Sequence, residues 1–201
     1  MKRKELEILL ERIPPNPSPK AELEQYATPA GIAADILFEA YARGDVAGKR
    51  IADLGCGTGV FATGAALLGA SESLGVDIDG NAVAIAGEYA RKLCAKAEFR
   101  TVDVKDISGD FDTVFQNPPF GYQARRLDRI FLTKALEVAP VVYTLHHAGA
   151  SEYIRKFIAG IGSVDFGQNY KFPMKHTYKF HSMAVKPVEV TLYRIIRTKA
   201  G

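Results

Sequence analysis

The chain has 201 residues, 47% of them hydrophobic and 24% charged, which is typical of one globular domain with a real core. The formal net charge of +3 is compatible with a polyanionic partner but too small to indicate one by itself. With only two cysteines and no apolar stretch of signal-peptide or membrane-spanning length, disulfide-rich secreted and membrane classes are excluded, and we expect a cytoplasmic protein.

The N-terminal part differs in pattern from the rest of the chain. Residues 3–12 carry apolar side chains at helical spacing, and prolines punctuate residues 13–29. Thr28 and Pro29 have the pattern of an N-cap and a first helical residue, and we expect a helix from there to about Arg43. We therefore divide the chain into an N-terminal helix and proline-rich arm (1–28) and a single domain (29–201).

Strands and helices then alternate along the chain. Five strands are predicted within 49–55, 71–79, 96–104, 109–120 and 140–146, helices at 59–70, 80–94, 127–139 and 150–162, and two further strands at 164–172 and 185–196. This order predicts an α/β fold: a doubly wound, mainly parallel seven-stranded sheet with helices on both faces. Because no helix separates the last two strands, we expect them to form a C-terminal antiparallel hairpin.

A glycine-rich segment, "DLGCGTG" (53–59), follows the first of these strands. Its glycines allow a tight turn and close approach of a ligand to the backbone. The spacing is G-x-G-x-G, and Asp53 precedes the turn, so a carboxylate stands where a pyrophosphate would be disfavoured and a cation favoured. S-adenosylmethionine is such a cation, and we assign its site to Asp53, Gly55, Cys56, Gly57, Thr58 and Gly59.

The next two strands end in acidic residues that suit a nucleoside. Asp77 comes about 20 residues after the glycine segment and can accept hydrogen bonds from ribose hydroxyls. Asp79 is the second option for this role, or caps the helix that follows it. We add Ile78 to the cofactor site, and after the third strand Asp103, as an acceptor for the adenine amino group, and Val104, packing on the ring.

The fourth strand ends in "NPPF" (117–120). Two prolines remove backbone donors and stiffen the segment, which leaves acceptors exposed. Asn117 Oδ1 and the Pro118 carbonyl can grip the two N–H bonds of a planar amine, Pro119 stiffens the turn, and Phe120 can stack on the ring. We assign catalysis to Asn117, Pro118, Pro119 and Phe120, with Asn117 also beside the cofactor.

These segments resemble the class I (Rossmann-like) S-adenosylmethionine-dependent methyltransferases over roughly residues 25–196: "DLGCGTG" is close to their glycine loop, "GVDID" to their ribose-binding strand end, and "NPPF" to the signature of those that act on amino nitrogens. "LEQYATP", "NPPFG" and "YKFHSMAVKPVEVTLYRI" are similar to the methyltransferase-like family that makes N6-methyladenosine in small-subunit ribosomal RNA. This resemblance implies that Gln25, Tyr26 and Thr28 close over the methionine end of the cofactor.

The same resemblance implies RNA as the substrate. Basic residues that suit phosphate contacts are Arg125, Arg126, Lys171, Lys175 and Lys179. It also implies a small zinc-binding activator subunit, which could pair with an edge strand near residues 93–102. We expect no metal site in this chain. A guanine N2 amine, a DNA adenine, a protein glutamine amide and a non-catalytic cofactor-binding scaffold remain as alternatives.

Overall fold

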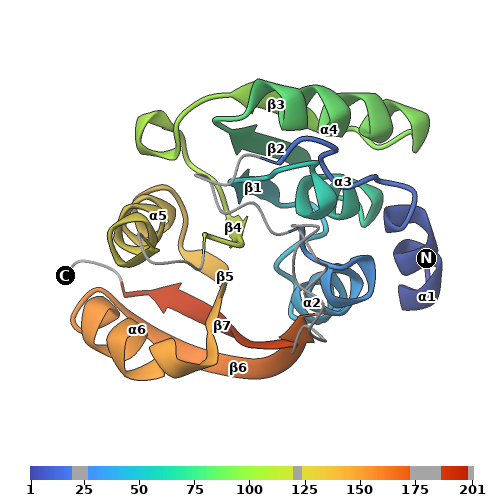
Figure 1. The fold of residues 1–201 in the computed structure, drawn as a ribbon. Helices are drawn as coiled ribbons and strands as arrows, with labels where there is room; N and C mark the ends of the chain where they lie inside the picture. Colours follow the sequence, from blue (N-terminus) through green and yellow to red (C-terminus); the bar gives the residue numbers. More distant parts are fainter. Residues whose placement is uncertain (20–26, 120–123, 173–186, 199–201) are drawn as a thin grey trace.

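Seven strands form one sheet in the order β3-β2-β1-β4-β5-β7-β6 in the computed structural model, which describes residues 1–19, 27–119, 124–172 and 187–198 (Figure 1). The strands are β1 (Arg50–Leu54), β2 (Glu72–Asp77), β3 (Glu98–Thr101), β4 (Thr113–Gln116), β5 (Val141–His147), β6 (Gly162–Phe172) and β7 (Val188–Arg197). β1 to β5 pair in parallel, whereas β7 runs antiparallel between β5 and β6. The predicted doubly wound sheet and its C-terminal antiparallel pair are confirmed.

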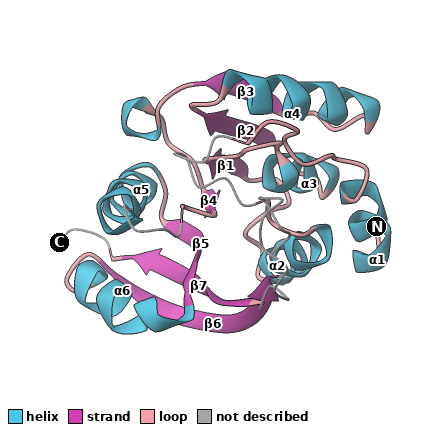
Figure 2. Cartoon of the chain, in the orientation of Figure 1, coloured by secondary structure: helices cyan, strands magenta, loops and turns pink. Residues whose placement is uncertain are grey.

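Helices cover both faces of this sheet (Figure 2). They are α1 (Arg3–Leu10), α2 (Ala30–Ala42), α3 (Val60–Leu67), α4 (Gly80–Lys92), α5 (Ala124–Val138) and α6 (Ser151–Ile158), with short 3-10 turns η2 (Val104–Asp106) and η3 (Ala148–Ala150). Figure 1 shows α2 and α3 on one side of the strands and α5 and α6 on the other. No helix in the described ranges is long and apolar enough to cross a membrane.

Two hydrophobic clusters, one on each face, hold the layers together. The first joins α1, α2 and α3 to the sheet, and the rings of Phe61, Phe115 and Tyr143 stack through it with centroids 5.6 and 5.1 Å apart. The second joins α5 and α6 to side chains such as Val114 and Val142 on the opposite face. Alternate residues of β4 and β5 therefore serve different cores, as a strand buried on both faces requires.

The N-terminal helix is part of the domain core. Leu6 and Leu10 of α1 are fully buried against α2 and α3, and Arg3 pairs with Asp35 of α2 at 2.8 Å. The predicted helix boundaries agree with the structure to within a few residues. The cap of α2 differs from the prediction. Thr28 is not the N-cap of α2, because Pro29 occupies that position and makes no side-chain cap.

Both edges of the sheet are visible in Figure 1: β3 at one edge and β6 at the other. The predicted edge strand near residues 93–102 is thus placed at an edge, although it is shorter than expected. It begins at Glu98, after Cys94, whose φ of 55° breaks the extended geometry. A short edge strand with mostly exposed side chains retains one row of backbone groups for pairing with another chain.

Candidate active site

The candidate site lies at the carboxyl edge of the parallel strands, where the strand order reverses. In register, Leu54 of β1 lies beside Val76 of β2 on one side and Gln116 of β4 on the other. The next residues in the chain, Gly55, Asp77 and Asn117, therefore meet at one edge. The sequence predicted all three as site residues, and the fold brings them together.

The glycines of the turn between β1 and α3 differ in how much space surrounds them. Gly55, Gly57 and Gly59 all have positive φ, at 68°, 53° and 85°. A Cβ at Gly59 would lie 2.6 Å from the Phe99 ring and 2.8 Å from the Ala86 methyl, so this glycine is needed for packing. A Cβ at Gly57 would meet nothing within 4 Å, so a ligand has open space over that peptide.

Asp53 lies beneath this turn and is only 1% exposed. Its Oδ2 accepts the Ala62 N–H at 2.9 Å, which fixes the turn to the first turn of α3. Burial raises the pKa of Asp53 to about 7, with a further increase from the charge of Asp77, although the Ala62 N–H opposes it. The carboxylate thus holds the first turn of α3 in place through its hydrogen bond with Ala62. A cation bound near the turn would stabilise the ionised form of this carboxyl group and lower its pKa.

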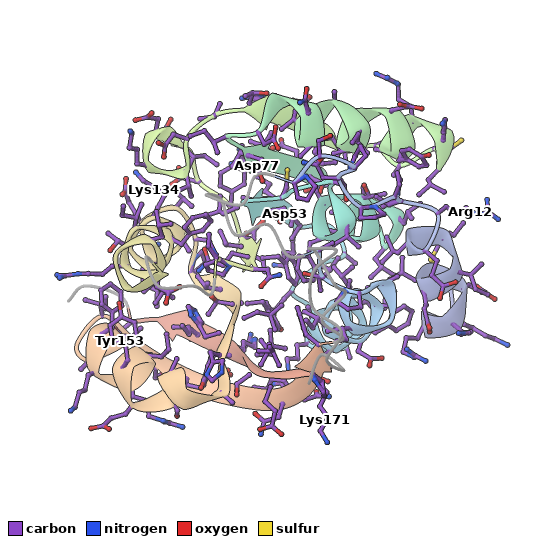
Figure 3. All side chains as sticks on the ribbon, viewed as in Figure 1. Arg12, Asp53, Asp77, Lys134, Tyr153 and Lys171 are labelled. Carbon is purple, nitrogen blue, oxygen red and sulfur yellow. The ribbon has the colours of Figure 1, made fainter. Side chains whose placement is uncertain are left out.

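Asp77 at the end of β2 is hydrogen-bonded to the backbone of the glycine turn. Its two carboxylate oxygens accept the N–H of Gly57 at 2.8 Å and the N–H of Asp79 at 2.9 Å. Burial raises its pKa, and these backbone donors oppose the shift. Figure 3 shows Asp53 and Asp77 close to each other at the ends of adjacent strands. The next side chain, Ile78, is 55% exposed and gives this rim an apolar surface.

Asp79 caps α4, as one of the two sequence interpretations predicted. It is 1% exposed, and its Oδ1 accepts the Asn81 N–H at 3.1 Å. Its Oδ2 accepts Asn16 Nδ2 from the proline arm at 2.9 Å. Sequence reasoning missed Asn16, because nothing local relates it to a residue 63 positions away. The contact joins the arm to the segment after β2, and the role of Asp77 as the ribose acceptor stays a prediction.

Asp103 and Val104 follow β3 at the start of η2. The Asp103 carboxylate accepts the Lys105 N–H at 3.0 Å and pairs with Lys105 Nζ at 3.0 Å. Partial burial would raise the pKa of Asp103, but the Lys105 backbone and side chain outweigh this and lower it. Val104 is half-buried against the α5 and α6 cluster. Their role at an adenine ring stays a prediction.

Asn117 meets the end of the N-terminal arm. Its Nδ2 donates to Thr28 Oγ1 at 3.0 Å, across 89 residues of sequence. Because the nitrogen end of the amide binds Thr28, the oxygen end points elsewhere, which is the orientation that an acceptor needs. Pro118 is buried and Pro119 half-buried, so the two prolines after Asn117 are packed against the rest of the domain. The Thr28 hydroxyl therefore binds the Asn117 amide and does not cap α2.

Cys56 lies in the turn as a buried thiol, with Sγ 3.6 Å from the Gly57 carbonyl. Burial holds its pKa well above the ordinary value, and the charges of Asp53 and Asp77 add to the effect. The thiol thus stays protonated and does not compete as a nucleophile. Thr58 is half-buried beside it.

Of the predicted RNA-binding residues, Lys171 has a described side chain. It is exposed near the end of β6, where it pairs with Glu189 in register, next to the Val190–His147 pair of β7 and β5. Lys171 therefore lies toward the carboxyl edge, three strands from β4. It is labelled in Figure 3.

Other predicted residues are placed less fully. Arg125 and Arg126 lie in the first turn of α5, which begins at Ala124, earlier than the expected residue 127. Gln25, Tyr26, Phe120, Lys175 and Lys179 lie outside the described residues. Within the described ranges no group of three or more His, Cys, Asp or Glu residues could hold a metal ion.

The residues present fit S-adenosylmethionine. Gly57 leaves space over its peptide, and Asp77 stands at the end of the next strand for a ribose. Ile78 offers an apolar rim, and the buried carboxyl group of Asp53 suits a cation. A pyrophosphate would instead add negative charge beside Asp53 and Asp77. The raised pKa values of these two groups indicate that negative charge is already disfavoured at this place.

Comparison with known proteins gives a consistent result. Residues 31–142 match the family described as the Methyltransferase small domain. The chain is 33% identical to the rRNA N(6)-adenosine-methyltransferase Mettl5 of Drosophila melanogaster, over 96% of each chain. It is 33% identical to METTL5 of Danio rerio, named for the same activity, over 98% of this chain and all of that one.

The fold also matches a solved structure. The crystal structure of PH1948 from Pyrococcus horikoshii, a candidate RNA methyltransferase, superposes with a TM-score of 0.90 and 37% identity over 98% of both chains.

Proposed function

We propose, from the premise that this chain belongs to the Methyltransferase small domain family, that it methylates the exocyclic N6 amine of an adenosine in small-subunit ribosomal RNA. S-adenosylmethionine is the cofactor. The observation that carries the proposal is the place of Asn117: it directly follows β4 beside the glycine turn, and its amide donates a hydrogen bond to Thr28. The two relatives that span nearly the whole chain and are named as rRNA adenosine N6 methyltransferases support the choice of substrate.

The chain's residues have to make a poor nucleophile reactive. The lone pair of an adenine amino group is delocalised into the ring. Asn117 Oδ1 and the Pro118 carbonyl accept its two N–H bonds and favour the more tetrahedral, more basic nitrogen of the transition state. When bound, S-adenosylmethionine supplies an electrophilic methyl group. Positioning then accounts for most of the rate, and no strong base is required since the methylated nitrogen is cationic and loses its proton readily.

RNA binding along the same edge is part of this proposal. Lys171 lies toward the carboxyl edge on β6, and Arg125 and Arg126 lie on the helix that follows the Asn117 segment. Cations from these segments can contact successive phosphates of one strand. A cytoplasmic location belongs to the proposal as well.

We also propose that a small zinc-binding activator subunit adds a strand to β3. This strand is at the sheet edge, and its side chains are mostly exposed. An incoming strand would complete its backbone hydrogen bonds. The other edge strand, β6, carries predicted RNA contacts, which favours β3 as the place for a protein partner.

Substitution of Asn117 tests the catalytic role. We expect Asn117→Ala to abolish transfer to ribosomal subunits while leaving cofactor affinity, measured by calorimetry, within about threefold of wild type. Thr28→Val should reduce transfer because it removes the hydrogen bond between Asn117 Nδ2 and the Thr28 hydroxyl, and Thr28→Ser, which keeps the hydroxyl, is the matched control. Loss of cofactor binding in Asn117→Ala would show that this residue builds the cofactor site instead.

A further inference from the structure

A chain of polar side chains runs through the hydrophobic core directly beneath the Asn117 corner. Gln116 Nε2 donates to Thr144 Oγ1 at 3.0 Å, and Thr144 Oγ1 lies 2.7 Å from His146 Nε2. His146 Nδ1 then faces Asp128 Oδ1 at 3.7 Å. Gln116, Thr144 and His146 are each exposed by 1% or less. We name Gln116, Thr144, His146 and Asp128 the β4–α5 polar chain.

These side chains lie on one face of the sheet. Gln116 and Thr144 are paired in register, and His146 follows two residues closer to the carboxyl edge, so all three point toward the α5 and α6 side. Val114 and Val142 flank them in the apolar cluster on that side. Buried polar groups cost stability relative to apolar ones unless they are well bonded, so their presence here needs a reason beyond packing.

The hydrogen bonds of the β4–α5 polar chain have a definite donor-to-acceptor direction. Burial lowers the pKa of His146 to about 3, so the ring is neutral and its approach to Asp128 is not an ion pair. A neutral ring has one N–H, and the carboxylate favours that proton on Nδ1. Nε2 then accepts from the Thr144 hydroxyl, whose oxygen accepts from Gln116. Hydrogen bonds thus join Gln116, Thr144 and His146, whereas Asp128 lies beside the ring at 3.7 Å, beyond hydrogen-bond distance.

The two ends of the β4–α5 polar chain lie on either side of the proposed catalytic segment in the sequence. Gln116 is the residue before Asn117, and Asp128 lies in α5, which begins at Ala124. The segment that carries Asn117 and Pro118 thus follows a side chain that is hydrogen-bonded to β5, and the helix after it places Asp128 beside the His146 ring of β5. Movement of β4 against α5 would break a contact in the core.

We propose that Thr144 and His146 are positioning residues for methyl transfer: they fix Gln116 and the start of α5 so that Asn117 and Pro118 are presented in one geometry. This inference rests on the proposed function for its kinetic consequences. Misplacement of a positioned acceptor by about 1 Å costs up to ~100-fold in rate, because the near-attack arrangement is lost.

Thr144→Val is the direct test, because valine keeps the shape and removes the hydroxyl between Gln116 and His146. Using the full chain, we expect kcat to fall ~10-fold to ~100-fold while the dissociation constant of S-adenosylmethionine changes by less than about threefold. Hydrogen exchange of the backbone amides between Asn117 and Asp128 should become faster. Thr144→Ser, which restores the hydroxyl, should return kcat and exchange close to the wild-type values.

Thr113→Val is the matched control. Thr113 is also a buried β-strand threonine, and its hydroxyl donates to the Asp45 carbonyl at 2.8 Å at the amino end of the sheet. It should lower stability as Thr144→Val does, yet leave kcat and exchange near Asn117 unchanged. If Thr144→Val does not fold, Gln116→Leu interrupts the chain at its other end and should reproduce the kinetic effect.

Two results would overturn the inference. One is a Thr144→Val or Gln116→Leu variant with wild-type kcat and wild-type exchange between Asn117 and Asp128. The other is Thr113→Val lowering kcat as much as Thr144→Val, which would reduce the effect to stability. The exchange and cofactor-binding measurements need no RNA, so they judge the inference even if the wild-type protein proves inactive on ribosomal RNA, a result that would refute the proposed function alone.

Discussion

Alanine substitutions at Gly57 and Gly59 should separate cofactor binding from folding within one turn. Both glycines have positive φ, so alanine at either position costs about 1–2 kcal/mol of stability from backbone strain. At Gly59 the new methyl would also lie 2.6 Å from the Phe99 ring and 2.8 Å from the Ala86 methyl. Overpacking of this kind adds about 1–3 kcal/mol, so Gly59→Ala should cost about 2–5 kcal/mol in total.

Gly57→Ala adds no such clash, because nothing lies within 4 Å of the position that its new methyl would occupy. Its cost to stability should be the strain alone, about 1–2 kcal/mol. The methyl would instead fill the space that we assign to the cofactor, and we expect the affinity for S-adenosylmethionine to fall by at least about tenfold, or 1.4 kcal/mol.

Chemical denaturation without cofactor measures the first quantity, and titration calorimetry on the folded variants measures the second. Two results would refute the reasoning. Wild-type cofactor affinity in Gly57→Ala would show that the open space over this peptide is not the cofactor site. Equal stability of the two variants would show that the Gly59 contacts with Phe99 and Ala86 do not constrain the turn.

Two further predictions concern pH. The pKa of Asp53 is about 7, and a cation favours its carboxylate, so S-adenosylmethionine should bind more tightly as pH rises from 6 to 8 and release protons in paired-buffer calorimetry; Asp53→Asn should abolish both effects, and their persistence would contradict the assignment. His146 has a folded-state pKa of about 3, below its unfolded value, so its contribution to stability is present above about pH 6.5 and is lost as pH falls toward 3, by up to about 1.4 kcal/mol per pH unit. The raised pKa of Asp53 acts in the opposite sense between about pH 4 and 7, so the prediction is the difference between wild type and His146→Gln in denaturation at each pH; parallel curves would contradict it.

Strand ends were predictable from the sequence, whereas contacts between distant side chains were not. Alternating strands and helices fix a parallel sheet, and a parallel sheet brings the ends of its strands to one edge, so Gly55, Asp77 and Asn117 could be assigned together. Side-chain partners depend on how α2, α5 and the arm pack, and no local pattern encodes that. Thr28 shows the difference, since its sequence context predicts a helix cap and its hydroxyl instead binds Asn117.

The polar side chains missed by the sequence analysis have a common cause. Thr144 and His146 occupy a strand whose neighbours are apolar, and from the sequence alone they read as ordinary strand residues. Asn16 lies in a proline-rich segment that gives no signal for its contact with Asp79. Each of these residues acquires its role from a partner at least one strand or helix away. The assignment of Asp53 to the cofactor site stays a prediction, and the hydrogen bond that its carboxylate accepts from the Ala62 N–H adds a structural role.

The measurement that tests the central claim most directly is methylation of small ribosomal subunits with labelled S-adenosylmethionine, with and without a candidate activator subunit, followed by digestion to nucleosides and amino acids. The proposed function predicts that label appears as N6-methyladenosine in the RNA and that Asn117→Ala gives none. Label in N2-methylguanosine or in glutamine of a ribosomal protein would contradict it.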